Sequence, residues 1–97
     1  MKVSIQDDDA LRAIGIAALS AYLRSSGWQQ TRLIGDRAAI WEQRNDRGEE
    51  FEVLVPQKLS LDDYALRIGQ AIHTLSVVED RSELDIYADI TKCEKPA

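Results

Sequence analysis

The sequence predicts an α+β fold, a two-layer sandwich in which helices cover one face of a three-stranded antiparallel meander. Apolar residues recur with helical spacing before residue 27 and again after residue 60. Between these segments lie three short strand-like runs, separated by turn sequences. Strands joined by short turns pair antiparallel, and a sheet with one apolar face is covered by helices. The expected order is helix, three strands, helix and short helix.

The first helix is expected over about 9–26, with a wide apolar arc along the helical period. Aspartates at its start favour the positive end of the helix dipole. Gly27 ends the helix because glycine adopts the left-handed conformation without steric cost. Trp28 follows the stop and is expected to fold back onto the helix near Leu23.

Three strands are expected next, and turn residues separate them. Gly35 marks the first turn, and the segment 45–48 marks the second. Pro56 ends the third strand because proline cannot donate a ladder hydrogen bond. The expected strands are 28–34, 38–43 and 50–55.

The register of the second hairpin decides which side of the sheet Trp41 occupies. A three-residue loop over 46–48, with Gly48 in the left-handed position, fixes one register. A slip of one residue would turn Trp41 to solvent, and we favour the register that buries it. The predicted pairs are Asn45 with Glu49, Arg44 with Glu50, Glu42 with Glu52, and Trp41 with Val53.

A long helix is expected after Ser60, which would cap it, with Asp63 completing an acidic variant of the capping box. One face is strongly apolar and reads as core. A second, weaker stripe combines Leu66, Gly69, His73 and Val77. If the last helix does not cover this second stripe, it is a candidate patch for a partner or for self-association, and Gly69 would permit close approach. The core face is Leu61, Tyr64, Ala65, Ile68, Ala71, Ile72, Leu75 and Val78.

A short last helix is expected to begin after Ser82, its cap, and to end near Thr91. The segment 79–81 interrupts the periodic pattern before it. Its expected apolar set is Leu84, Ile86, Tyr87 and Ile90.

Length and composition limit the classes of protein. The 97 residues fit one domain, expected over 1–93, with 94–97 as a frayed tail. Hydrophobic residues make up 44% and the net charge is −5, which suits a globular chain and excludes disorder. One cysteine excludes a disulfide scaffold, and the longest uncharged stretch is too short to span a bilayer. The acidic N-terminus is unlike a secretory signal, so we expect a cytoplasmic location and no membrane partner.

Catalytic groups are scarce. His73 is the one histidine, and a packing or surface role is expected for it because no nucleophile is paired with it in the sequence. Cys93 lies near the tail, where nothing lowers its pKa. No zinc spacing or phosphate-binding loop occurs, so we expect no cofactor, no metal and no catalytic residue. Glu42 and Glu52 oppose one another, either as a cation or acid–base pair or as carboxylates neutralised by neighbouring arginines.

Four arginines lie in the strand region and could contact nucleic acid. Six acidic residues in the same region outnumber them, and a domain with a net charge of −5 repels a polyanion at long range. A nucleic-acid partner is therefore expected to be the weaker alternative. The four are Arg32, Arg37, Arg44 and Arg47.

Over residues 11–75 the chain resembles the HicA-type mRNA interferase toxins and, more loosely, double-stranded-RNA-binding domains. The resemblance implies the same order of helix, three strands and helix. These toxins carry a histidine just after the turn glycine, where this chain has the segment 36–38, Asp-Arg-Ala, so the resemblance comes without the catalytic residue. The matching features are Gly27-Trp28, the Gly35 turn and Val55-Pro56.

Several short segments are also similar to those of an uncharacterised bacterial family, whose members carry this region as an N-terminal module of longer proteins. The similarity implies no activity. Taken together, the sequence predicts a non-enzymatic protein-interaction or regulatory module of the bacterial cytoplasm. Its expected partner is another protein or a second copy of itself in a homodimer. The alternative is a HicA-like nucleic-acid-binding domain. The similar segments are 22–28, 40–41, 51–56, 63–65 and 81–85.

Overall fold

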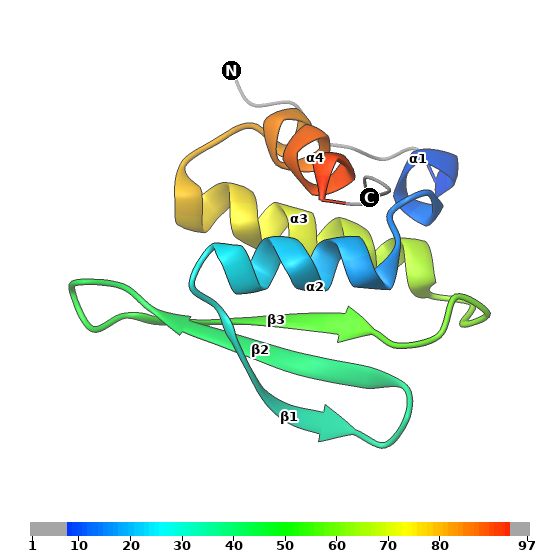
Figure 1. The fold of residues 1–97 in the computed structure, drawn as a ribbon, viewed down its shortest axis with the longest axis horizontal. Helices are drawn as coiled ribbons and strands as arrows, with labels where there is room; N and C mark the ends of the chain where they lie inside the picture. The colour runs from blue at the N-terminus through cyan, green and yellow to red at the C-terminus, as the bar shows by residue number, and fades with distance from the viewer. Residues whose placement is uncertain (1–7, 94–97) are drawn as a thin grey trace.

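A computed structural model describes residues 8–93 (Figure 1). Residues 1–7 and 94–97, including the predicted frayed tail, lie outside the described residues. The described part is an α+β fold with a three-stranded antiparallel sheet in the order β1-β2-β3, as predicted. The elements are α1 (Asp8–Arg12), α2 (Ile16–Ser25), β1 (Gln29–Ile34), β2 (Ala38–Arg44), β3 (Glu50–Pro56), α3 (Tyr64–Glu79) and α4 (Glu83–Lys92).

The helices lie on one side of the sheet (Figure 1). α2 and α3 lie next to the sheet and both contact β3, while α1 and α4 lie over them on the side away from the strands. One apolar core joins the inner sheet face to all four helices. The helical part is therefore two helices deep, because α1 and α4 bury residues of their own against α2 and α3.

The expected single helix over 9–26 is wrong: the structure has two helices with a break at 13–15. Gly15 is the N-cap of α2 and has extended dihedral angles, φ −80° and ψ 154°. Glycine is a poor residue for a helix interior, which lowers the cost of breaking there. The break turns α1 back over α3, so that both Leu11 and Ile14 are buried.

Two tyrosine hydroxyls donate hydrogen bonds to backbone carbonyl groups next to this break. In a continuous helix the carbonyl groups of Ala10 and Ile14 would accept from amides four residues later. Instead, the Tyr64 hydroxyl donates to the carbonyl of Ile14, and the Tyr87 hydroxyl donates to that of Ala10 at 3.0 Å. Side chains of α3 and α4 thus satisfy backbone acceptors that the break releases.

The stop at the end of α2 is confirmed. Gly27 has φ +91°, and the amide of Trp28 donates to the carbonyl of Leu23 at 2.9 Å. Trp28 is buried in the core. Gln43 donates to the Ser26 carbonyl at 2.7 Å, which ties β2 to the end of α2. The chain therefore leaves α2 in a direction that places β1 beside β2.

The predicted register of the second hairpin is confirmed at every pair, including Trp41 with Val53 and Glu42 with Glu52. Gly48 has φ +83°, as the bulge requires. Trp41 is buried on the helix-covered face, and the Arg24 guanidinium lies 5.7 Å from its ring centroid. The edge strand β1 carries a bulge between Gln30 and Arg32 and is exposed along its length.

The boundaries of the last two helices differ in part from expectation. α3 begins at Tyr64, three residues later than expected, and Ser60 lies in a turn and does not cap it. α4 follows the prediction, since the Ser82 hydroxyl accepts from the amide of Leu84 at 3.2 Å. Leu84 itself is exposed, not core, because α4 turns only Ile86 and Ile90 fully inward.

A polar network fastens α2, α3 and α4 at the end opposite the break. The Tyr22 hydroxyl donates to Glu79 at 2.9 Å, and Arg81 bridges Glu79 at 3.1 Å and Asp89 at 2.6 Å. The hydrogen bond from Arg81 lowers the pKa of Asp89. Burial and, second, the bond to Glu79 raise the pKa of Tyr22 to about 12.

We expect Tyr64→Phe to lower the free energy of unfolding by about 1–3 kcal/mol, because the buried Ile14 carbonyl loses its donor. Urea unfolding followed by circular dichroism measures this. Tyr87→Phe is the matched control and should cost less, because Tyr87 is only half-buried and water can replace its hydroxyl. Equal stability of wild type and Tyr64→Phe would contradict the role given to this bond.

Tyr22 should ionise well after the ordinary tyrosine value of 10.0, in a step centred near pH 12. A raised pKa means that folding favours the neutral phenol, so its contribution to stability is complete below pH 10 and is lost as the pH rises towards 12. Titration by ultraviolet absorbance should show this late step in wild type and not in Tyr22→Phe. A wild-type titration without it would refute the assignment.

Candidate functional site

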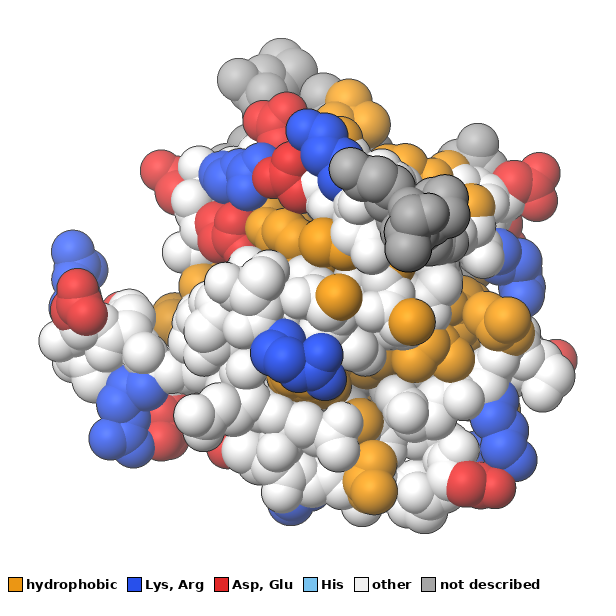
Figure 2. Space-filling view, in the orientation of Figure 1, with side chains coloured by type: hydrophobic (Ala, Val, Ile, Leu, Met, Phe, Trp, Pro, Cys, Tyr) orange, Lys and Arg blue, Asp and Glu red, His pale blue; other side chains and the backbone are white. Residues whose placement is uncertain are grey.

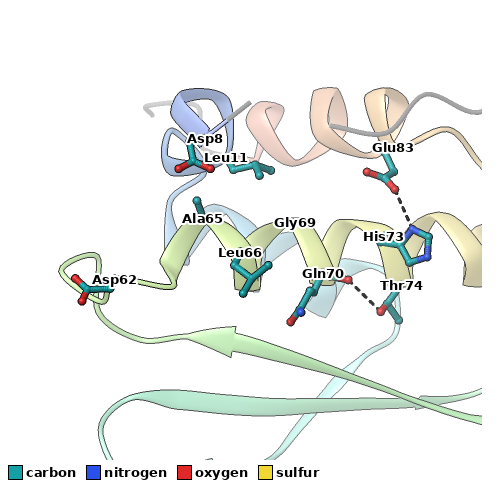
Figure 3. Close-up of a pocket in the computed structure, with 10 residues that line it drawn as sticks. All are labelled: Asp8, Leu11, Asp62, Ala65, Leu66, Gly69, Gln70, His73, Thr74 and Glu83. Atoms are coloured by element: carbon teal, nitrogen blue, oxygen red, sulfur yellow. Dashed lines mark hydrogen bonds and ion pairs between the residues drawn. The ribbon is translucent and has the colours of Figure 1, made fainter. Parts of the chain in front are cut away.

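A surface groove runs along α3, between α1 and the start of α4 (Figure 3). Its volume is about 660 Å³, within the range of ligand-binding clefts. Three members of the predicted second stripe line it: Leu66, Gly69 and His73. The full lining is Asp8, Leu11, Asp62, Ala65, Leu66, Gly69, Gln70, His73, Thr74 and Glu83.

The floor of the groove is the contact of α1 with α3. Leu11 and Ala65 are buried, and a Cβ atom on Gly69 would lie 3.3 Å from the Leu11 Cδ1 atom. Gly69 therefore permits a close helix approach, as its place in the second stripe suggested. The approaching element is α1 of the same chain, and this leaves the groove beside it open.

The apolar rim of the groove is exposed. Leu66 is 58% exposed, and Val77, about three turns further along α3, is 57% exposed. Val77 does not line the groove, so the structure brings three of the four predicted patch residues together and leaves the fourth outside it. α4 covers neither Leu66 nor Val77, which answers the question left open by the sequence.

Charge is distributed unevenly along the groove (Figure 3). Asp8, in the first turn of α1, and Asp62, in the turn before α3, lie at one end. Neither carboxylate has a partner among residues 8–93. At the other end His73 faces Glu83, and no Lys or Arg is among the described lining residues. Within residues 8–93 the groove thus offers carboxylates without a basic partner next to an apolar floor.

His73 links α3 to α4. Its Nδ1 lies 3.0 Å from Oε2 of Glu83, whose side chain is only 7% exposed. Against an ionised carboxylate, which only accepts, the ring nitrogen is the donor of this hydrogen bond. Within residues 8–93 no hydroxyl or thiol bonds to the ring: Thr74 donates to the Gln70 carbonyl. A His–carboxylate pair without a nucleophile in contact favours a structural role, that of holding the first turn of α4 on α3.

The opposed glutamates lie on the sheet face that the helices leave open. Glu42 pairs with Glu52 as predicted, and Arg32 reaches Glu52 with an Nη2–Oε2 distance of 3.4 Å. The part of the chain from 8 to 93 contains no group of three His, Cys, Asp or Glu placed to hold a metal. Of the two interpretations left open, this contact favours neutralisation by a neighbouring arginine.

The four candidate nucleic-acid arginines do not form a patch. Arg32 and Arg44 pair with Glu52 and Glu50, while Arg37 and Arg47 lie in the turns at opposite ends of β2 (Figure 1). A strand of seven residues separates these turns by about 20 Å. Figure 2 shows acidic and basic side chains interspersed around the molecule on the face in view.

Comparison with protein-family models, with curated proteins and with solved structures gave no significant match. Over residues 8–93 no helix is both long and apolar enough to cross a membrane.

The sequence did not indicate the other side of the groove. The expected first helix, 9–26, contains Leu11 and begins just after Asp8, while Glu83 falls in the first turn of the expected last helix. The one available signal was Gly15 between two isoleucines, which marks a weak point in a helix. Nothing in the spacing of residues shows that α1 folds back onto Gly69.

Substitutions of Gly69 should separate helix propensity from the contact with α1. Gly69→Ala should leave the free energy of unfolding within about 1 kcal/mol of wild type, because higher helix propensity offsets a small shift of Leu11. Gly69→Leu should lose about 1–3 kcal/mol by pushing Leu11 out of place. Urea unfolding of both variants tests this, and equal stability of the two would show that α1 does not pack there.

Proposed function

We propose that this chain is a non-enzymatic protein-interaction or regulatory module, acting in a bacterial cytoplasm, and that it binds a segment of another protein in the groove between α1 and α3. The observation that carries the proposal is the groove itself, in which the exposed Leu66 stands on the rim beside a buried apolar floor. Concave surfaces that combine apolar side chains with a few polar groups are typical of binding sites.

Two further observations support this reading. α1, α3 and α4 position the groove through buried contacts, so its walls are preformed and little ordering is needed on binding. Among the described residues of the groove, no hydroxyl or thiol contacts the His73 ring. A hydrolytic site that uses a nucleophile would need such a contact with a base. Binding is therefore the chemistry for which the groove is best suited.

Nucleic-acid binding remains the alternative, through the arginines of β1, β2 and their turns. Nucleic-acid binding has less support, because Arg32 and Arg44 already pair with Glu52 and Glu50 on the open sheet face. These carboxylates neutralise positive charge that would otherwise attract a phosphate. The dispersal of the other two arginines weakens it further.

The proposal can be tested with peptides selected from a random display library of about twelve residues, a length that spans about 18 Å as a helix. The selection uses the full chain as bait. Enriched peptides should lose binding by about tenfold or more on Leu66→Glu, because this change puts a charge on the rim.

Leu33→Glu is the matched control. Leu33 is 62% exposed, close to the value for Leu66, but it lies on β1, away from the groove. The control should bind the peptides as wild type does, and circular dichroism should show all three proteins folded. Failure to enrich any peptide, or equal loss in both variants, would overturn the proposal.

A further inference from the structure

We infer that the segment bound in the groove is basic and amphipathic, with a Lys or Arg side chain directed to Asp8 and Asp62 and apolar side chains on the floor. This inference rests on the proposed function and names the chemistry of the partner. It follows from the arrangement of charge and apolar surface within one groove (Figure 3).

Asp8 and Asp62 differ from several other carboxylates on the described surface, which have basic partners. Basic side chains near carboxylates pair with them elsewhere, as in Lys58 with Asp36 at 2.8 Å and Arg67 with Asp63 at 3.1 Å. Asp8 and Asp62 have no such partner within residues 8–93, although Asp62 is adjacent to Asp63 in sequence. A cation supplied from outside would find two carboxylates at one end of the groove that no base within residues 8–93 neutralises.

The apolar surface beside the two aspartates suits a Lys or Arg side chain better than a free cation. In Figure 3 Ala65 lies opposite Asp8, and the exposed Leu66 lies beside them, on the way along α3 to His73. The aliphatic stem of a Lys or Arg can cover such a surface while its charged group stays at the wet end. A residue of the same segment on the next helical turn would then reach the floor near Leu11 and Gly69.

A second copy of this chain is a poorer occupant of the same groove. In a two-fold dimer the same surface meets itself, so the acidic groove of one copy would face an acidic groove with no Lys or Arg among its described lining residues. Like charges at an interface oppose association. The net charge of −5 on each copy adds to this repulsion, which favours a partner of opposite charge.

The test compares two synthetic peptides of about twelve residues, one a helix with Leu and Lys on adjacent faces and the other with Gln in place of each Lys. Fluorescence anisotropy measures their affinity for the full chain. The Lys peptide should bind more tightly, and its affinity should fall as salt is raised. Asp8→Asn and Asp62→Asn should each weaken it about two- to fivefold, the range for exposed ion pairs, and the double variant that combines them should weaken it more than either alone.

The matched control is the double variant Glu42→Gln with Asp46→Asn. It lowers the net negative charge by the same amount as the double variant of Asp8 and Asp62, but both residues are exposed on the sheet side, outside the groove lining. It should bind the Lys peptide nearly as wild type does. Equal losses in the two double variants would mean attraction by net charge alone and would overturn the inference.

Failure of this inference can be distinguished from failure of the proposed function. If display-selected peptides require Leu66 but lack Lys and Arg, and bind the two aspartate variants as they bind wild type, the groove is an interaction site with another partner chemistry, and the inference is wrong. If sedimentation shows a dimer that Leu66→Glu dissociates, a second copy is the occupant and the inference is also wrong. If neither the display-selected nor the synthetic peptides bind, the proposed function itself is wrong, and the inference that rests on it is wrong with it.

Discussion

The pairing of Trp41 with Val53 across β2 and β3 is the constraint on which the rest of the structure depends. In this register both side chains enter the core beneath the helices, and Glu42 and Glu52 turn to the open face. A slip by one residue would exchange the two faces. α2 and α3 would then meet carboxylates in place of an apolar surface, and the sheet could not support them.

The groove depends on a second constraint, the break before Gly15. A helix that ends early leaves carbonyl groups without intrahelical donors, and burying them unpaired would cost stability. Tyr64 and Tyr87 supply hydroxyl donors from α3 and α4. The same contacts hold α1 against Gly69, so the hydrogen bonds that permit the break also build one wall of the groove.

Much of the fold could be predicted because its signals are local. The glycine stop and Trp28, the bulge at Gly48 and the Ser82 cap each depend on a few consecutive residues and on backbone geometry. The errors lie where a local signal competed with packing. Gly15 was compatible with a helix or a break, and Ser60 with a cap or a turn. Tertiary contacts of Leu11 and Tyr64 decided both.

The candidate site also contains residues that a local signal predicts and residues that only packing brings together. The helical period alone put Leu66, Gly69, His73 and Val77 on one stripe of α3, because side chains three and four residues apart share a face. Only the tertiary structure decided that Asp8, Asp62 and Glu83 join that stripe, since these residues come from three other segments of the chain. Periodicity determines which residues of one helix face the same way. The packing of all helices and strands in one core determines which other segments of the chain lie next to that face.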